Sequence, residues 1–103
     1  MVDLYEFQKA NVQRSIEYAG QQTHDDWSLD ELGCDIAGEV GEICNAIKKY
    51  QGRGSKKDVI TETDIGKEMA DVISYLCILA DKLNLDLGAC CKMKFDEVTM
   101  NRS

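Results

Sequence analysis

The sequence has no proline and no long hydrophobic run. Proline removes a backbone donor and clashes inside a helix, so its absence leaves all 103 residues compatible with helix. No apolar stretch approaches the roughly 20 residues that a membrane-spanning helix needs, and we expect no membrane span. The first residues, MVDLYEFQKA, lack the basic-then-apolar order of a secretory signal, and we therefore expect a cytoplasmic protein.

Positive charge is also scarce. The chain has 12 Lys and Arg against 19 Asp and Glu, which gives a formal net charge of -7. General binding to nucleic acid needs a basic face that neutralises phosphates, and this balance argues against it. An acidic protein that handles an anionic substrate needs a bridging cation or a local basic patch.

Metal-ligating cysteine and histidine patterns are missing. The cysteines are odd in number and form no C-x-x-C pair, and we expect them to be reduced, mostly as small core residues: Cys34, Cys44, Cys77, Cys90 and Cys91. His24 is the single histidine. Di-iron carboxylate bundles need a Glu-x-x-His pair on each of two helices, so one chain cannot build that site.

Helix-capping residues and polar loops divide the chain into four helical segments. Asp3, Ser28 and Asp86 are placed as N-caps, and Gly20 is placed to end the first helix. We expect helices over about residues 4–19, 29–50, 62–83 and from 87 through at least 95. The sequence thus predicts an all-α, antiparallel bundle of about four helices, as a single domain over residues 1–103 that oligomerisation completes.

Apolar residues lie on one side of each of the first three helical segments, and in the second they recur at steps of three and four, which predicts the buried faces. The first stripe is Leu4, Tyr5, Val12, Ile16 and Ala19. The second is Leu29, Leu32, Ile36, Val40, Ile43 and Ile47. The third is Ile65, Met69, Val72, Leu76, Leu79 and Leu83.

Carboxylates line one edge of the second and third stripes. They are Asp35, Glu39 and Glu42 on one helix, and Asp64, Glu68 and Asp71 on the other, with Tyr75 in line. Antiparallel neighbours would bring the two edges together, and their repulsion would need a compensating cation. An oxygen-only cluster suits Mg²⁺ or Mn²⁺. The alternative is a solvated acidic face, which is the usual environment of helix carboxylates.

The segment Glu39-Val-Gly-Glu42, followed by Glu68-Met-Ala-Asp71, resembles the E-x-x-E…E-x-x-D signature of the MazG-type nucleotide pyrophosphohydrolases. The similarity extends through GEVGEICNAIKK, GKEMADVISYLCILADKLNLDL and KFDEV, over roughly residues 38–98. It implies Mg²⁺-dependent hydrolysis of (deoxy)nucleoside triphosphates to monophosphate and pyrophosphate. The metal ligands would be Glu39, Glu42, Glu68 and Asp71. A glutamate that the metal does not fully engage would act as the general base. The similarity also implies a homo-oligomer, dimer or tetramer, that removes non-standard or surplus nucleotides.

The resemblance also assigns one substrate contact on the last helix. Lys94 lies in a segment similar to the family's K-F-N, which implies contact with phosphate. Asp96 stands where relatives often have asparagine, and this departure puts a polar nucleotide contact there in doubt.

Other candidates for substrate binding rest on residue chemistry. Arg53, Lys56 and Lys57 concentrate positive charge in a glycine-containing loop that would close over a triphosphate, unless it is an ordinary connector. Trp27 would either stack on a base or pack on the start of the second helix. His24 would contact nucleotide or remain a surface loop residue.

Two other function classes remain open at this point. One is a catalytically idle helical module that binds nucleotide or protein, although all four acids of the signature are intact. The other is a metal-binding bundle for storage or sensing.

Overall fold

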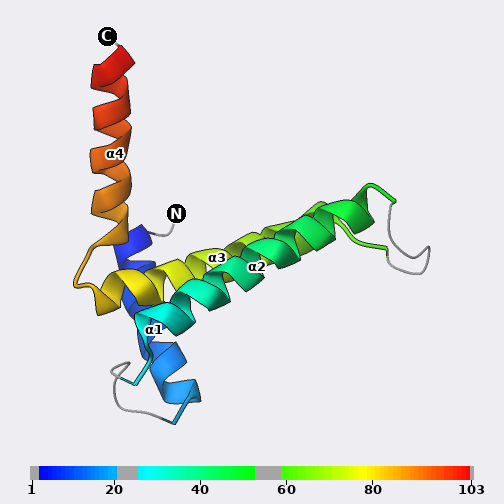
Figure 1. Ribbon diagram of the computed structural model, residues 1–103, viewed down its shortest axis with the longest axis horizontal. Helices are drawn as coiled ribbons and strands as arrows, with labels where there is room; N and C mark the ends of the chain where they lie inside the picture. The colour runs from blue at the N-terminus through cyan, green and yellow to red at the C-terminus, as the bar shows by residue number, and fades with distance from the viewer. Residues whose placement is uncertain (1–2, 21–25, 53–58, 103) are drawn as a thin grey trace. The chain divides into compact units, whose positions relative to one another are not determined.

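The computed structural model describes residues 3–20, 26–52 and 59–102. Across these ranges it contains four helices and no strand: α1 (Leu4–Tyr18), α2 (Leu29–Tyr50), α3 (Glu62–Lys82) and α4 (Leu87–Arg102) (Figure 1). The all-α prediction is therefore confirmed. Nowhere in the described ranges is a helix both long enough and apolar enough to cross a bilayer.

Local capping fixes the helix starts where the sequence predicts them. The side chains of Asp3, Ser28 and Asp86 accept hydrogen bonds from backbone N–H groups of the following turn at 2.9, 3.0 and 3.0 Å. Such a bond satisfies one of the donors that the first turn of a helix leaves without a partner. After α1, Gly20 adopts φ +68°, a left-handed conformation that glycine enters without steric cost.

The chain divides into two compact units. The first contains residues 1–26 and 76–103, and the second contains residues 27–75. The first unit thus holds α1, the end of α3 and α4, and the second holds α2 and most of α3.

The first unit has a small buried core contributed by α1 and the end of α3. Its buried apolar residues are Val12, Ile16, Cys77, Ile78 and Ala80. Two polar side chains of α1, Gln8 and Asn11, are also buried, with 1% and 4% of their surface exposed. Burying a polar group is unfavourable unless it is hydrogen-bonded, so we expect both side chains to have hydrogen-bond partners.

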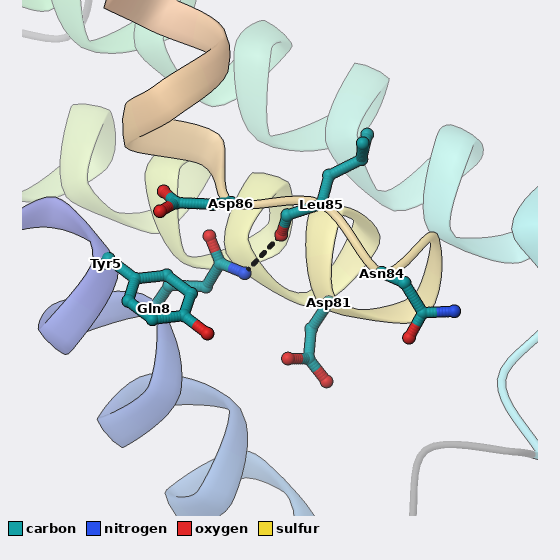
Figure 2. A pocket seen from close by; sticks show the side chains of 6 residues that line it. All are labelled: Tyr5, Gln8, Asp81, Asn84, Leu85 and Asp86. Carbon is teal, nitrogen blue, oxygen red and sulfur yellow. Dashed lines mark hydrogen bonds between the residues drawn. The ribbon is translucent and has the colours of Figure 1, made fainter.

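Gln8 provides such a contact to the connection between α3 and α4. Its Nε2 donates to the Leu85 carbonyl at 2.8 Å (Figure 2). Its Oε1 accepts from the Leu87 backbone N–H at 2.9 Å. Asn84, at the end of α3, has φ +58°, a left-handed conformation that asparagine tolerates. The buried amide therefore holds the turn that starts α4 against α1.

The second unit is a helical hairpin. Helices α2 and α3 lie side by side and run in opposite directions (Figure 1). Tyr50 at the end of α2 donates a hydrogen bond from its hydroxyl to Glu62 at the start of α3, at 2.9 Å. Leu32 is buried, and Ile36, Ile43, Ile65 and Val72 are half-buried. This hairpin brings the two acidic edges together.

Several positions of the predicted buried faces are exposed in the single chain. Val40, Ile47 and Met69 expose 44%, 41% and 52% of their surface. Their stripes are wider than the contact that one neighbouring helix provides, so the outer positions stay accessible. At the helix ends and on α1, the same correction applies to Leu29, Leu83, Tyr5 and Ala19.

The cysteines also depart from the prediction of a mostly buried set. Cys77 is buried and Cys90 half-buried, whereas Cys34, Cys44 and Cys91 are exposed free thiols. Their helical positions place these three outside the packed faces. Burial raises the pKa of the Cys77 thiol, which keeps it protonated.

Candidate metal centre

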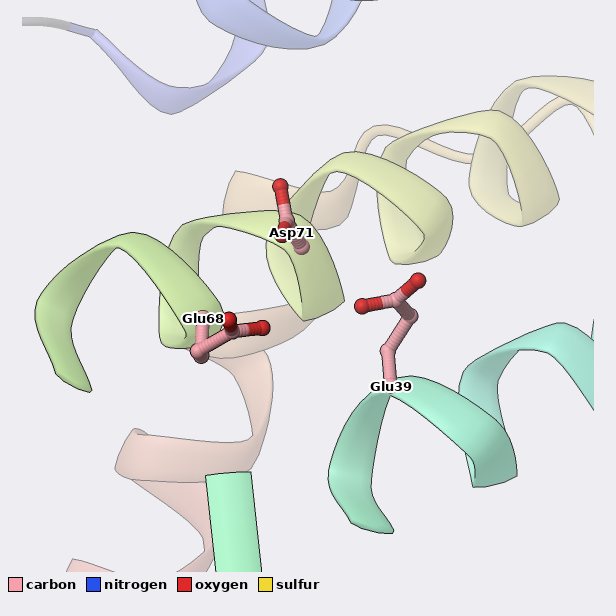
Figure 3. Close-up of side chains that lie close together, drawn as sticks. All are labelled: Glu39, Glu68 and Asp71. Atoms are coloured by element: carbon pink, nitrogen blue, oxygen red, sulfur yellow. The ribbon is translucent and has the colours of Figure 1, made fainter. Parts of the chain in front are cut away.

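Three carboxylates from two helices converge in the second unit. Glu39 comes from α2, and Glu68 and Asp71 come from α3 (Figure 3). One oxygen from each residue can be chosen so that all three lie within 4.8 Å of one another. Glu39 and Glu68 are half-buried and Asp71 is exposed. Three of the four acids that the sequence predicts as metal ligands therefore lie close together in this unit.

The helical spacing explains the convergence. Glu68 and Asp71 are three residues apart, so they lie on the same face of α3 about one turn apart. Glu39 lies on the facing side of α2, between Ile36 and Ile43, which are half-buried. The apolar residues that pack the hairpin thus place these carboxylates beside the helix contact.

Negative charge accumulates around Glu39. Burial raises the pKa of this carboxyl, and the charges of Asp71, Glu68, Glu42 and Asp35 raise it further, in that order. A cation among these oxygens would reverse the electrostatic part of that shift, because it favours the ionised carboxylate. Positive charge bound here would therefore be favoured electrostatically.

The donor set fits a hard divalent cation. Carboxylate oxygens alone, with no nitrogen or sulfur, are the preferred protein ligands of Mg²⁺, Mn²⁺ and Ca²⁺. Mg²⁺ takes octahedral coordination, so three carboxylate oxygens would leave positions for water or phosphate oxygens. The group is the one His, Cys, Asp and Glu cluster with metal-ligand spacing in the described ranges.

Glu42, the fourth predicted ligand, lies outside this group of three. Its side chain is exposed, and its charge still contributes to the raised pKa of Glu39. Three residues separate it from Glu39, so it lies about one turn further along the same edge of α2.

Tyr75 also belongs to this acidic region. The sequence alone indicates only that it lies in line with the carboxylates of the third helix. It is half-buried, and burial raises the pKa of its phenol, as do the charges of Asp35, Glu39 and Asp71. The phenol therefore stays protonated near neutral pH. Its position four residues after Asp71, one helical turn away, is the signal that identifies it.

Asp64 has a different role from the other acids of the edge. Its Oδ2 accepts from the Thr61 backbone N–H at 2.8 Å, and its own N–H donates to the Thr61 hydroxyl at 3.3 Å. This reciprocal pair is a capping box at the start of α3. The backbone and side-chain hydrogen bonds of Thr61 lower the pKa of Asp64. Asp64 is thus a structural residue.

The predicted substrate contacts are only partly located. Trp27 is half-buried immediately before the N-cap of α2. Lys94, on α4 in the first unit, is exposed and pairs with Glu97 at 3.7 Å, and Asp96 accepts a hydrogen bond from Lys92 at 2.9 Å. His24, Arg53, Lys56 and Lys57 lie outside the described residues.

Comparison of the chain with protein-family models, curated proteins and solved structures found no match. The functional argument therefore depends on the residues of this chain and on their arrangement.

Proposed function

We propose that this protein is a Mg²⁺-dependent nucleoside triphosphate pyrophosphohydrolase of the MazG type. The observation that carries the proposal is the convergence of Glu39, Glu68 and Asp71 across the α2–α3 hairpin. The E-x-x-E…E-x-x-D spacing supports the same reading, because three of its four acids are the residues that meet. The product assignment, monophosphate and pyrophosphate, comes from the resemblance.

Each group in the site has a chemical task in this proposal. Glu39, Glu68 and Asp71 would hold the cation, with Mn²⁺ as a possible replacement for Mg²⁺. The bound cation supplies charge neutralisation on the phosphates and lowers the pKa of water. The protonated Tyr75 hydroxyl is a donor for an anionic oxygen, a charge type that preorganised donors stabilise.

Glu42 is proposed either as the fourth ligand or as the group that accepts a proton from the attacking water. The Glu42→Gln variant separates the two roles. If Glu42 is a ligand, Mg²⁺ affinity falls with turnover, whereas loss of a proton acceptor lowers kcat and leaves Mg²⁺ affinity unchanged. Glu31→Gln, an exposed glutamate in the first turn of the same helix, is the matched control.

The assay that tests the proposed function uses a panel of natural and damaged dNTPs, with released pyrophosphate as the readout. The proposal requires Mg²⁺-dependent pyrophosphate release from at least one member of the panel. Nucleotide binding without turnover, over the whole panel and with Mn²⁺ as well as Mg²⁺, would favour the idle module. Cation binding with no response to nucleotide would favour a storage or sensing bundle.

We also propose that the working form is a homo-oligomer, a dimer or tetramer, in the cytoplasm, where it removes non-standard or surplus nucleotides. Val40, Ile47 and Met69 support association, because they belong to the predicted buried faces of α2 and α3 and a second copy would cover them. The mass in solution, measured by light scattering, tests this part. A monomeric mass at assay concentration would contradict it.

A further inference from the structure

We draw no further inference here: the strongest candidate, the half-exposed apolar surface of the α2–α3 hairpin that includes Val40, Ile47, Met69 and Ile73, carries nothing because no element in the described part of the chain is shown to cover it, and pairing with a second copy restates the homo-oligomer already proposed from the family resemblance.

Discussion

Glu39 of α2 and Asp71 of α3 each contribute an oxygen to one cluster, although they are far apart in the sequence. After burial, the charge of Asp71 is the largest cause of the raised pKa of Glu39. Two acids from different helices thus share one electrostatic environment. Without a cation this arrangement is electrostatically unfavourable, and a cation bound among these oxygens would offset the repulsion. The predictions below follow from that relationship.

The first prediction contrasts two aspartates of α3 that the sequence places on the same edge. We expect Asp71→Asn to reduce turnover by roughly 100-fold or more, the scale of losing a group that stabilises transition-state charge, with thermal stability unchanged or slightly raised. We expect Asp64→Ala to lower Tm, because α3 loses its capping box, and to leave kcat nearly unchanged. Pyrophosphate release and thermal unfolding measure the pair. If Asp64→Ala lost turnover and Asp71→Asn only lowered Tm, Asp64 would be the site residue and Asp71 the structural one.

The second prediction concerns cation binding to the folded state. Mg²⁺ or Mn²⁺ should raise Tm, by linkage, with a stabilisation of about 2.7 kcal/mol at 100 times the Kd. A chelator should reverse the shift. Glu68→Gln should remove most of the shift, whereas Asp30→Asn, an exposed acid in the first turn of α2, should retain it. A shift of equal size in both variants would mean that the cation binds elsewhere.

The third prediction is the pH dependence of stability without metal. The pKa of Glu39 is raised above its ordinary value of 4.5, so between the two values the folded state holds more protons than the unfolded state. The free energy of unfolding therefore falls as pH rises through that interval, and the favourable contribution is fully present only below pH 4.5.

Denaturant unfolding of metal-free wild type and Glu39→Gln isolates this contribution. The two proteins should have similar stability below pH 4.5, and the variant should be the more stable near neutral pH. Saturating Mg²⁺ should reverse the order near neutral pH, because it stabilises only the protein that retains the carboxylate. A pH-independent difference between the two proteins would contradict the electrostatic account of the site.

The fourth prediction concerns the buried amide of Gln8. Gln8→Ala leaves the Leu85 carbonyl and the Leu87 N–H without their partner, and we expect a loss of about 2–4 kcal/mol in the free energy of unfolding. Gln13→Ala is the control, since Gln13 is exposed and donates to Glu17 within α1. Equal losses in the two variants would contradict the assigned role.

Gln8→Glu refines that test. The new carboxylate still accepts from the Leu87 N–H, but it places an oxygen against the Leu85 carbonyl, where Nε2 had donated. The variant should therefore be unstable near neutral pH and recover on acidification, when a carboxylic acid can donate. Urea unfolding at several pH values gives this comparison directly.

Much of the fold was predictable because its signals are local. Asp3, Ser28 and Asp86 cap helices through bonds to N–H groups two or three residues away, so the pattern alone locates these helix starts. The failed predictions concern packing between elements. Periodicity gives the direction in which Val40 and Met69 project, but it does not give the area that a neighbouring helix covers.

The candidate site was likewise predictable in its local pattern and not in the packing between its helices. The sequence places six acids on two matching edges, and geometry then separates them. Glu39, Glu68 and Asp71 meet, Asp64 caps α3, and Glu42 lies outside the group of three. Which of the acids spaced three or four residues apart meet depends on how far α2 is shifted along its axis relative to α3. Helix periodicity does not determine that shift.

The point of water attack tests the central proposal most directly. The sequence contains no G-x-x-x-x-G-K-[ST] loop, whose backbone would cradle the β- and γ-phosphates, and the resemblance implies attack at the α-phosphorus. Hydrolysis of a dNTP in ¹⁸O-labelled water, with Mg²⁺, should place the label in the nucleoside monophosphate and none in pyrophosphate. Label in pyrophosphate, or in free phosphate released as the first product, would contradict this account.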